Sequence, residues 1–320
     1  MQRGIERFIY GLSNQLVKSF NVKVTLYVWE SKKKVEWGEW ESRIKFKFVP
    51  YSKYYQSILA KIFYKIWSWR DSADAYLINF IYHGELSIHK ASKIFYVLHS
   101  PATLIPKRYE LIEREYQKNK NIKFISVSGF VKKSSELYLD SKSNSVIHHG
   151  IDFEKINQKK DYQQSGKLKI LTVAALESWK GVQHVISAFS SSIIKENFVY
   201  HIIGDGPFRK ELDQQVKKYN IEDSVLFLGS KNFVESLYCN YDIYCQLSDG
   251  EAFGISVIEA MGAGLPTIVY DIPPFDSLFL LDIIIKIDKD CNDGLKNNLL
   301  SLLSLQERQK IGTKGQEYVT

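Results

Sequence analysis

The sequence predicts an α/β protein in which two Rossmann-like domains with mostly parallel sheets face one another. The chain has 320 residues, enough for two ordinary domains that each have a core. Short apolar runs alternate with segments of helical periodicity in both halves. A polar run at 157–167 separates the halves and is the best linker candidate. We therefore expect a first domain over residues 1–156 and a second over 168–320.

In the first half, apolar residues at helical spacing predict one helix over residues 3–18 and another over Ser57–Arg70. The second of these also carries Lys, Arg and Trp. It fits equally a crossover helix on a sheet or a helix on an anionic membrane. Apolar runs predict strands at Val22–Trp29, Ile44–Val49, Asp74–Phe80, Lys93–Leu98, Ile122–Ser128 and Val146–Asp152.

His99 directly follows the expected strand Lys93–Leu98. Ligands of open parallel sheets bind beyond the carboxyl ends of the strands, so His99 is a candidate site residue. A structural role for this histidine fits the position equally well.

The second half has expected strands at Leu168–Val173, Tyr200–Ile203, Val225–Gly229 and Tyr241–Gln246. After them, Leu247–Val269 has the pattern of a strand end, a polar turn, a short helix and another strand. This alternation of strands and helices predicts a second parallel sheet.

Glu251 and Glu259 lie within that last stretch. On one continuous helix they would be about 12 Å apart along the axis and about 80° apart around it, so they are not a facing pair. We place Glu251 in the turn and Glu259 about a turn into the helix, each reaching a different part of a ligand. The helix start, at Gly254, Ile255 and Ser256, offers backbone N–H groups that suit a phosphate. The alternative is a solvated acidic turn followed by an ordinary helix glutamate.

The composition, with 45% hydrophobic and 25% charged residues, describes a globular protein. Three cysteines without metal-ligand spacing favour a reducing compartment, and no apolar run reaches the roughly 18 residues that span a bilayer. We therefore expect a cytoplasmic protein.

The net charge of +7 is unevenly distributed. Residues 1–153 hold 25 Lys and Arg against 14 Asp and Glu, a balance of +11, and the remainder holds 18 against 22, a balance of −4. Such a basic half suits an anionic substrate such as a lipid or a glycan, or peripheral contact with the inner membrane surface. No nucleic-acid motif accompanies it, so we expect no nucleic-acid partner.

The residues from Glu251 to Pro266, E-A-F-G-I-S-V-I-E-A-M-G-A-G-L-P, resemble the Glu-x7-Glu signature of retaining glycosyltransferases of family 4, which have the GT-B fold. The resemblance is strong over Leu168–Val269 and looser before it. It implies that Glu251 lies near the donor sugar and its phosphates, and that Glu259 hydrogen-bonds the ribose. The donor-binding residues expected at the helix start are Phe253, Gly254 and Ile255.

Further matches to this family surround the signature. Lys180 resembles a lysine that neutralises the donor diphosphate and stabilises charge growing on the leaving group. His99 resembles a histidine close to the donor phosphates and the acceptor. The loop Gly229–Phe233 is where the resemblance puts the nucleobase. A Gly-x-Gly-Pro turn also matches, with Gly204, Gly206 and Pro207 as expected substrate-binding residues.

Other positions depart from the family pattern. Gly4 follows Arg3 in a segment that resembles a glycine-rich turn with one glycine replaced and no strand before it. Gly4 can bring the backbone close to a ligand phosphate, or it can simply begin a helix. Ala175 stands where an arginine is usual, which leaves one cation where two are expected. Prolines 273 and 274 replace a Gly-Gly turn, and the sequence stops before the helix that usually crosses back to the first domain.

The resemblance implies transfer of a sugar from a nucleoside diphosphate donor to a lipid, glycan or protein acceptor, with retention of anomeric configuration. It implies neither a metal nor a cofactor. Two alternatives stay open. One is a nucleotide-sugar hydrolase or epimerase of the same fold, and the other is a binding or scaffold subunit with weakened or lost turnover.

Overall fold

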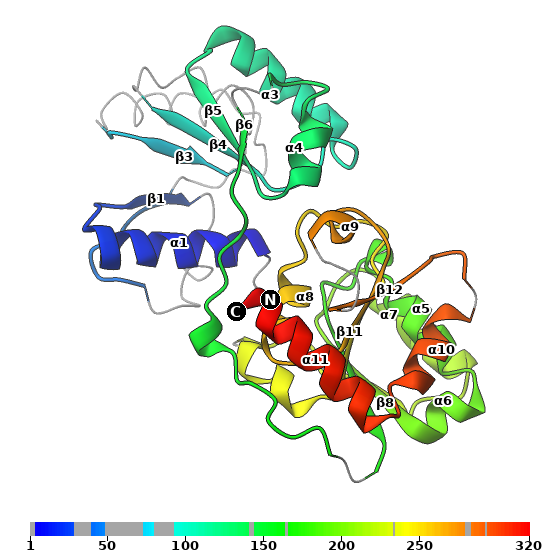
Figure 1. The fold of residues 1–320 in the computed structure, drawn as a ribbon. Coiled ribbons are helices and arrows are strands. Elements are labelled where there is room, and N and C mark those ends of the chain that lie inside the picture. Colours follow the sequence, from blue (N-terminus) through cyan, green and yellow to red (C-terminus); the bar gives the residue numbers. More distant parts are fainter. Residues whose placement is uncertain are drawn as a thin grey trace. The chain divides into compact units, whose positions relative to one another are not determined.

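The computed structural model describes residues 4–28, 40–48, 73–79, 93–140, 144–163, 166–232, 234–278, 283–291 and 293–320. The chain forms two compact units that divide between Gly150 and Ile151, slightly before the expected end of the first domain at residue 156. Figure 1 shows the elements of both units. The helix expected over Ser57–Arg70 lies outside the described residues.

The first unit contains two parallel sheets. One pairs β1 with β2, and the other has the strand order β3-β4-β5-β6. The central strand β4 is almost entirely buried, as expected for a parallel strand covered on both faces. The strands are β1 Thr25–Val28, β2 Lys45–Phe48, β3 Tyr76–Ile78, β4 Ile94–Leu98, β5 Ile122–Ser126 and β6 Asn144–Val146.

The described helices of this unit are α1 Gly4–Phe20, α3 Pro106–Lys118 and α4 Gly129–Ser135. Local signals explain two of the helix starts. Pro106 begins α3, where its missing N–H removes no helical hydrogen bond. Ser128 caps α4, its hydroxyl accepting from the Val131 amide at 3.2 Å.

The expected strand Val146–Asp152 is wrong in its position. In the structure β6 ends at Val146, which pairs with Ser126 at the last position of β5. Ile147 makes one more backbone hydrogen bond, to Ser126, and the chain is irregular beyond it. The apolar pattern continues here, but the neighbouring strand has ended.

The second unit has one six-stranded parallel sheet in the order β12-β11-β10-β7-β8-β9. The chain starts in the middle of the sheet, moves outward to β9, and then returns to the other side of β7 with β10. This is the doubly wound order, and its switch point lies between β7 and β10. The strands are β7 Leu168–Val173, β8 Phe198–Ile203, β9 Val225–Phe227, β10 Ile243–Gln246, β11 Thr267–Tyr270 and β12 Ile285–Ile287.

The described helices of the second unit surround the sheet (Figure 1), and the last two of them follow β12, the final strand. They are α5 Val182–Ala188, α6 Ser192–Asn197, α7 Arg209–Lys218, α8 Ile255–Gly262, α9 Phe275–Leu278, α10 Gly294–Ser301 and α11 Leu305–Val319. Among the described residues of the whole chain, none of the helices combines the length and apolar character that crossing a bilayer requires.

Residues 157–163 of the expected linker pack against the rest of the second unit. The Lys159 amide donates to the Ala263 carbonyl at 2.8 Å, and Lys159 Nζ lies 3.0 Å from Asp242 Oδ1. The Tyr162 hydroxyl donates to the Gly264 carbonyl at 2.6 Å. These contacts hold the segment against the α8–β11 connection and against the residue that precedes β10.

Candidate functional site

The switch point of the second sheet gathers the loops that carry the predicted donor-site residues. The loop after β7 ends in a short 3-10 helix, Ser178–Lys180, and the loop after β10 leads to α8. Parallel strands end at the same edge of a sheet, so the two loops meet beside β7 and β10. Lys180 and Glu251 come from these two loops.

Lys180 and Glu251 form an ion pair, with Lys180 Nζ 2.6 Å from Glu251 Oε1. The two side chains are 15% and 9% exposed, so the pair is largely removed from water. Lys180 Nζ also lies 4.2 Å from the centre of the Trp179 ring, a favourable cation–π distance. The structure therefore brings two of the predicted catalytic side chains into direct contact.

Backbone contacts hold the two loops together. The Asp249 amide donates to the Trp179 carbonyl at 2.7 Å. Gly181 has a φ of +71°, and a Cβ atom at this position would collide with the Leu247 carbonyl. Glycine is therefore required by conformation and by space, and this close approach brings Lys180 to Glu251.

Sequence reasoning missed Gln246, the last residue of β10, which contacts the same carboxylate. Its side-chain amide donates to Glu251 Oε1 at 2.6 Å, and its carbonyl oxygen accepts from the hydroxyls of Tyr244 and Ser256. A polar residue in an otherwise apolar buried strand was the one signal that the sequence offered.

Glu259, in the second turn of α8, is only 1% exposed. Its Oε2 accepts from the Tyr238 hydroxyl at 3.0 Å. The carboxylate is thus buried in the second unit, on a different element from the turn that carries Glu251.

The start of α8 agrees with the expected geometry. Gly254 holds the cap position with a φ of +86° and supplies no side-chain cap to the first amides of the helix, which include that of Ile255. A Cβ on Gly254 would lie 2.5 Å from the Phe275 ring. Phe253 is 5% exposed and belongs to the core.

The Gly-x-Gly-Pro turn follows β8 and packs against the loop after β7. The Leu176 amide donates to the Asp205 carbonyl at 3.1 Å, and the Phe208 amide donates to the Leu176 carbonyl at 2.9 Å. A Cβ on Gly206 would collide with the backbone of Leu176. The close packing against Leu176 thus explains why glycine is found at position 206. Gly204 is buried and Pro207 is exposed.

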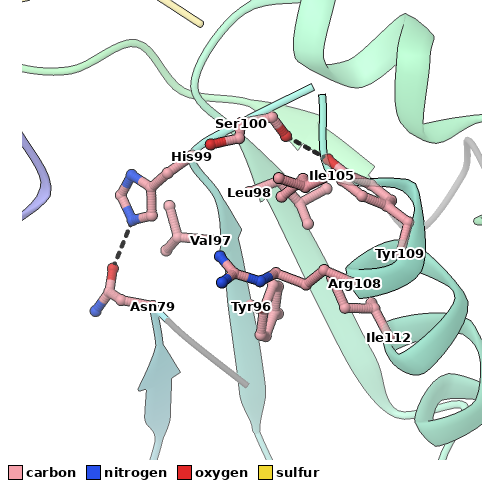
Figure 2. A pocket seen from close by; sticks show the side chains of 10 residues that line it. All are labelled: Asn79, Tyr96, Val97, Leu98, His99, Ser100, Ile105, Arg108, Tyr109 and Ile112. Atoms are coloured by element: carbon pink, nitrogen blue, oxygen red, sulfur yellow. Dashed lines mark hydrogen bonds between the residues drawn. The ribbon is translucent and has the colours of Figure 1, made fainter. Parts of the chain in front are cut away.

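The first unit carries His99 at the carboxyl end of β4, as the sequence predicted. His99 Nε2 lies 2.8 Å from Asn79 Oδ1, which follows β3 (Figure 2). The ring stacks on His149 with centres 5.4 Å apart, and Phe8 of α1 contacts both rings. Burial and the neighbouring histidine lower the pKa of His99 to about 3, and burial, followed by the charge of His148, lowers that of His149 to about 4.

Both rings are therefore neutral near neutral pH. Since an amide oxygen only accepts, the Nε2 of His99 donates to Asn79 and Nδ1 carries the lone pair. That Nδ1 atom is buried and has no hydrogen-bond partner among the described residues. His99 can thus accept a hydrogen bond from a hydroxyl that reaches it.

A small pocket adjoins His99 between β4 and α3. Figure 2 shows the Arg108 side chain extending from α3 across the face of β4, and the Tyr109 hydroxyl donating to the Ser100 carbonyl at 2.8 Å. Gly4, in the same unit, is the first residue of α1.

Within the described ranges, no group of three or more His, Cys, Asp or Glu side chains is arranged to hold a metal ion. The residues Asp288, Lys289 and Asp290, which follow β12, form an Asp-x-Asp triplet. The backbone amide of Asp290 donates to Asp288 Oδ1 at 2.9 Å.

The two parallel-sheet units define the class of the protein, since solved structures of the GT-B fold match nearly the whole chain. HepE of Anabaena, in complex with UDP and glucose, is similar with a TM-score of 0.82 and 18% identity over 99% of this chain and 91% of that chain. WaaG, a glycosyltransferase involved in lipopolysaccharide biosynthesis, is similar with a TM-score of 0.79 and 16% identity over 99% and 91%. At these identities the likeness shows the fold, which confirms the GT-B prediction.

The family model described as glycosyl transferases group 1 matches residues 153–317, more than half of the chain. The chain therefore belongs to the group 1 glycosyltransferase family, as its Glu-x7-Glu stretch implied.

Curated relatives match part of the chain. The N-acetyl-alpha-D-glucosaminyl L-malate synthase of Bacillus anthracis is 33% identical over 146 residues, 43% of this chain and 38% of the relative. The alpha-monoglucosyldiacylglycerol synthase of Streptococcus pneumoniae is 28% identical over 118 residues, 36% of this chain and 27% of the relative. The matched region therefore spans well under half the length of these relatives.

Proposed function

We propose that the chain transfers a sugar from a nucleoside diphosphate donor to an acceptor hydroxyl with retention of anomeric configuration. The observation that carries the proposal is the Lys180–Glu251 pair, at 2.6 Å, beside the switch point of the second sheet. Membership of the group 1 glycosyltransferases supports a nucleotide sugar as the donor.

The positive charge of Lys180 suits the negatively charged diphosphate of the donor. Its ammonium group has three N–H donors and gives one to Glu251, so two donors are left to share between the Trp179 ring and phosphate oxygens. The first amides of α8 add a positive helix end without a side-chain cap. Together they would stabilise the negative charge that grows on the leaving nucleoside diphosphate.

Glu251 and Glu259 divide the remaining donor contacts. Lys180 and Gln246 both donate to Oε1 of Glu251. Oε2 makes no hydrogen bond within the described part of the chain, so we assign Oε2 to the donor sugar. Glu259 is assigned to the ribose, for which its carboxylate would exchange or share the hydrogen bond from Tyr238.

The reaction breaks the bond between the anomeric carbon and the diphosphate oxygen and forms a bond from that carbon to the acceptor oxygen on the same face. The acceptor proton passes to the leaving diphosphate, so no covalent sugar–enzyme intermediate is required. His99, neutral and with a buried Nδ1 lone pair, is assigned to accept a hydrogen bond from a sugar or acceptor hydroxyl.

The test is to incubate the protein with a panel of nucleotide sugars, with and without acceptors, while measuring nucleotide release and donor binding. Release that depends on an acceptor supports transfer. Release that is unaffected by acceptors supports a hydrolase or epimerase instead, and binding without release supports a scaffold. Glu251→Ala should abolish transfer, whereas Glu211→Ala, on the exposed face of α7, should not.

The acceptor panel follows from chemistry and from the relatives. The two relatives described above are named for the synthesis of a glucosaminyl L-malate and of a glucosyldiacylglycerol, which indicates different acceptor classes within one family. We favour an anionic lipid or glycan, because residues 1–153 have a net charge of +11 from 25 basic and 14 acidic residues.

We also propose that this basic half contacts the anionic inner surface of a membrane peripherally. Sedimentation with vesicles tests this proposal. Binding to vesicles with anionic lipid that weakens with salt is expected, and equal binding to neutral vesicles would contradict it.

A further inference from the structure

We infer that Gln246 is the positioning residue for Glu251, an inference that rests on the proposed transferase function. Gln246 is 1% exposed at the carboxyl end of β10. Its amide group lies between two hydroxyls on one side and the Glu251 carboxylate on the other. The distances are 2.6 Å from Tyr244 Oη to Gln246 Oε1, 2.7 Å from Ser256 Oγ to the same oxygen, and 2.6 Å from Gln246 Nε2 to Glu251 Oε1.

The surroundings allow one orientation of this amide. If the group were reversed, its oxygen would face the carboxylate of Glu251, which is acceptor against acceptor. In the orientation found, both hydroxyls donate to Oε1 and the NH₂ group faces Glu251. The Tyr244 hydroxyl is fully buried, which raises its pKa and keeps it protonated as a donor.

The fixed orientation of the Gln246 amide in turn fixes the carboxylate of Glu251. Lys180, from the loop after β7, and Gln246, at the end of β10, contact the same oxygen at 2.6 Å each. Two donors on Oε1 hold the rotation of the carboxylate and leave Oε2 for the substrate. Lys180 can be drawn toward a bound diphosphate, but Gln246 is locked by its own hydroxyl donors and keeps Glu251 in place.

Tyr244 and Ser256 complete this support from separate elements. Tyr244 belongs to β10 and Ser256 to the first turn of α8, the helix whose start we assign to the diphosphate. The network therefore links the position of Glu251 to the position of that helix start. Buried polar groups that are hydrogen-bonded on both sides in this way favour one side-chain arrangement.

The experiment compares Gln246→Met, which keeps the approximate size and removes the donor, with Gln214→Met on the exposed face of α7. We expect Gln246→Met to lower kcat by roughly 10- to 100-fold, the rate equivalent of one hydrogen bond to a charged group. The KM for the donor and the affinity for the nucleotide should change less than about threefold, because the group acts on geometry in the transition state. Gln214→Met should behave as the unmodified chain.

Gln246→Glu gives a second readout that loss of packing would not produce. The introduced carboxyl can donate to Glu251 only when it carries a proton, so the activity of this variant relative to the unmodified chain should rise as the pH is lowered. A relative activity that does not change with pH would overturn the inference.

The outcomes separate this inference from the proposed function. If the unmodified chain releases nucleotide in an acceptor-dependent way, Glu251→Ala abolishes it and Gln246→Met retains full kcat, the inference is wrong and the proposed function stands. If Gln246→Met raises KM and weakens nucleotide binding in parallel with kcat, the residue is merely structural and the inference is also wrong. If no nucleotide sugar gives turnover in the unmodified chain, the proposed function fails first.

Discussion

Lys180 supports a buried carboxylate and is the cation that we assign to the diphosphate. We expect Lys180→Met to lower the free energy of unfolding by roughly 1–3 kcal/mol, because Glu251 then keeps only one donor at a largely buried position. Since a fixed cation acts on the leaving group, kcat should also fall at least about 100-fold. Urea unfolding midpoints and initial rates measure both effects. Lys210→Met, at the exposed start of α7, is the matched control, and equal effects in the two variants would contradict the assignment.

His99 and His149 make the first unit sensitive to acid. Their pKa values in the folded chain are lowered to about 3 and about 4, from 6.5, mainly by burial. As the pH falls below about 6.5 the unfolded chain takes up protons on both rings while the folded chain does not, so stability falls from about pH 6.5 down to about pH 4.

A series of thermal unfolding curves from pH 7 to pH 4.5 measures this dependence. His99→Gln and His149→Asn should each make stability less dependent on pH. The exposed neighbour His148 contributes only the smaller cause of the lowered pKa of His149, so His148→Gln should change the slope less than either of these variants. A slope unchanged in all three variants would mean that other groups carry the acid sensitivity.

The loop after β7 can approach the loop after β10 because Gly181 has no side chain. Gly181 and Gly166 both have positive φ values, +71° and +97°, but only at Gly181 would a Cβ meet another segment, the Leu247 backbone. Gly166→Ala should therefore cost about 1 kcal/mol of backbone strain. Gly181→Ala should cost more and also reduce activity, because it separates the loops that carry Lys180 and Glu251. Melting temperatures and rates for the two variants test this difference, and an equal loss in both would show that the clash is relieved without cost.

At the scale of the whole molecule, the segment after the first unit is part of the second unit's packing. The Lys159–Asp242 pair is buried, with both side chains 8% exposed. Arg308 of α11 donates to the Tyr162 carbonyl at 3.0 Å and closes the segment from the other side. Residues 157–163 therefore behave as part of the folded unit.

Removing one partner of that pair leaves a buried charge. We expect Lys159→Met to lower the free energy of unfolding by about 3 kcal/mol and to speed hydrogen exchange of the Lys159 amide, which donates to Ala263. Lys160→Met, at the exposed neighbouring position, should change neither quantity. Fast exchange of this amide in the unmodified chain would contradict the packing.

Much of the fold could be predicted because its signals are local. The strand Leu168–Val173 was predicted to the residue, since a short apolar run between polar segments marks a buried strand. The helix after Glu251 was predicted from a polar turn and a glycine that precede it and from the strand pattern that follows it. The end of β6 was not, because it depends on where the neighbouring strand β5 stops.

The family, the alternation of strands and helices, and the positions of three site residues after strands could be predicted, because these depend on patterns a few residues long. The three residues are Glu251, Lys180 and His99. Which atoms meet could be seen only in the folded chain. Lys180 and Glu251 are 71 positions apart, and Gln246 gains its role from hydroxyls on two elements. Contacts of this kind depend on the packing of loops that are distant in sequence, and no local pattern records them.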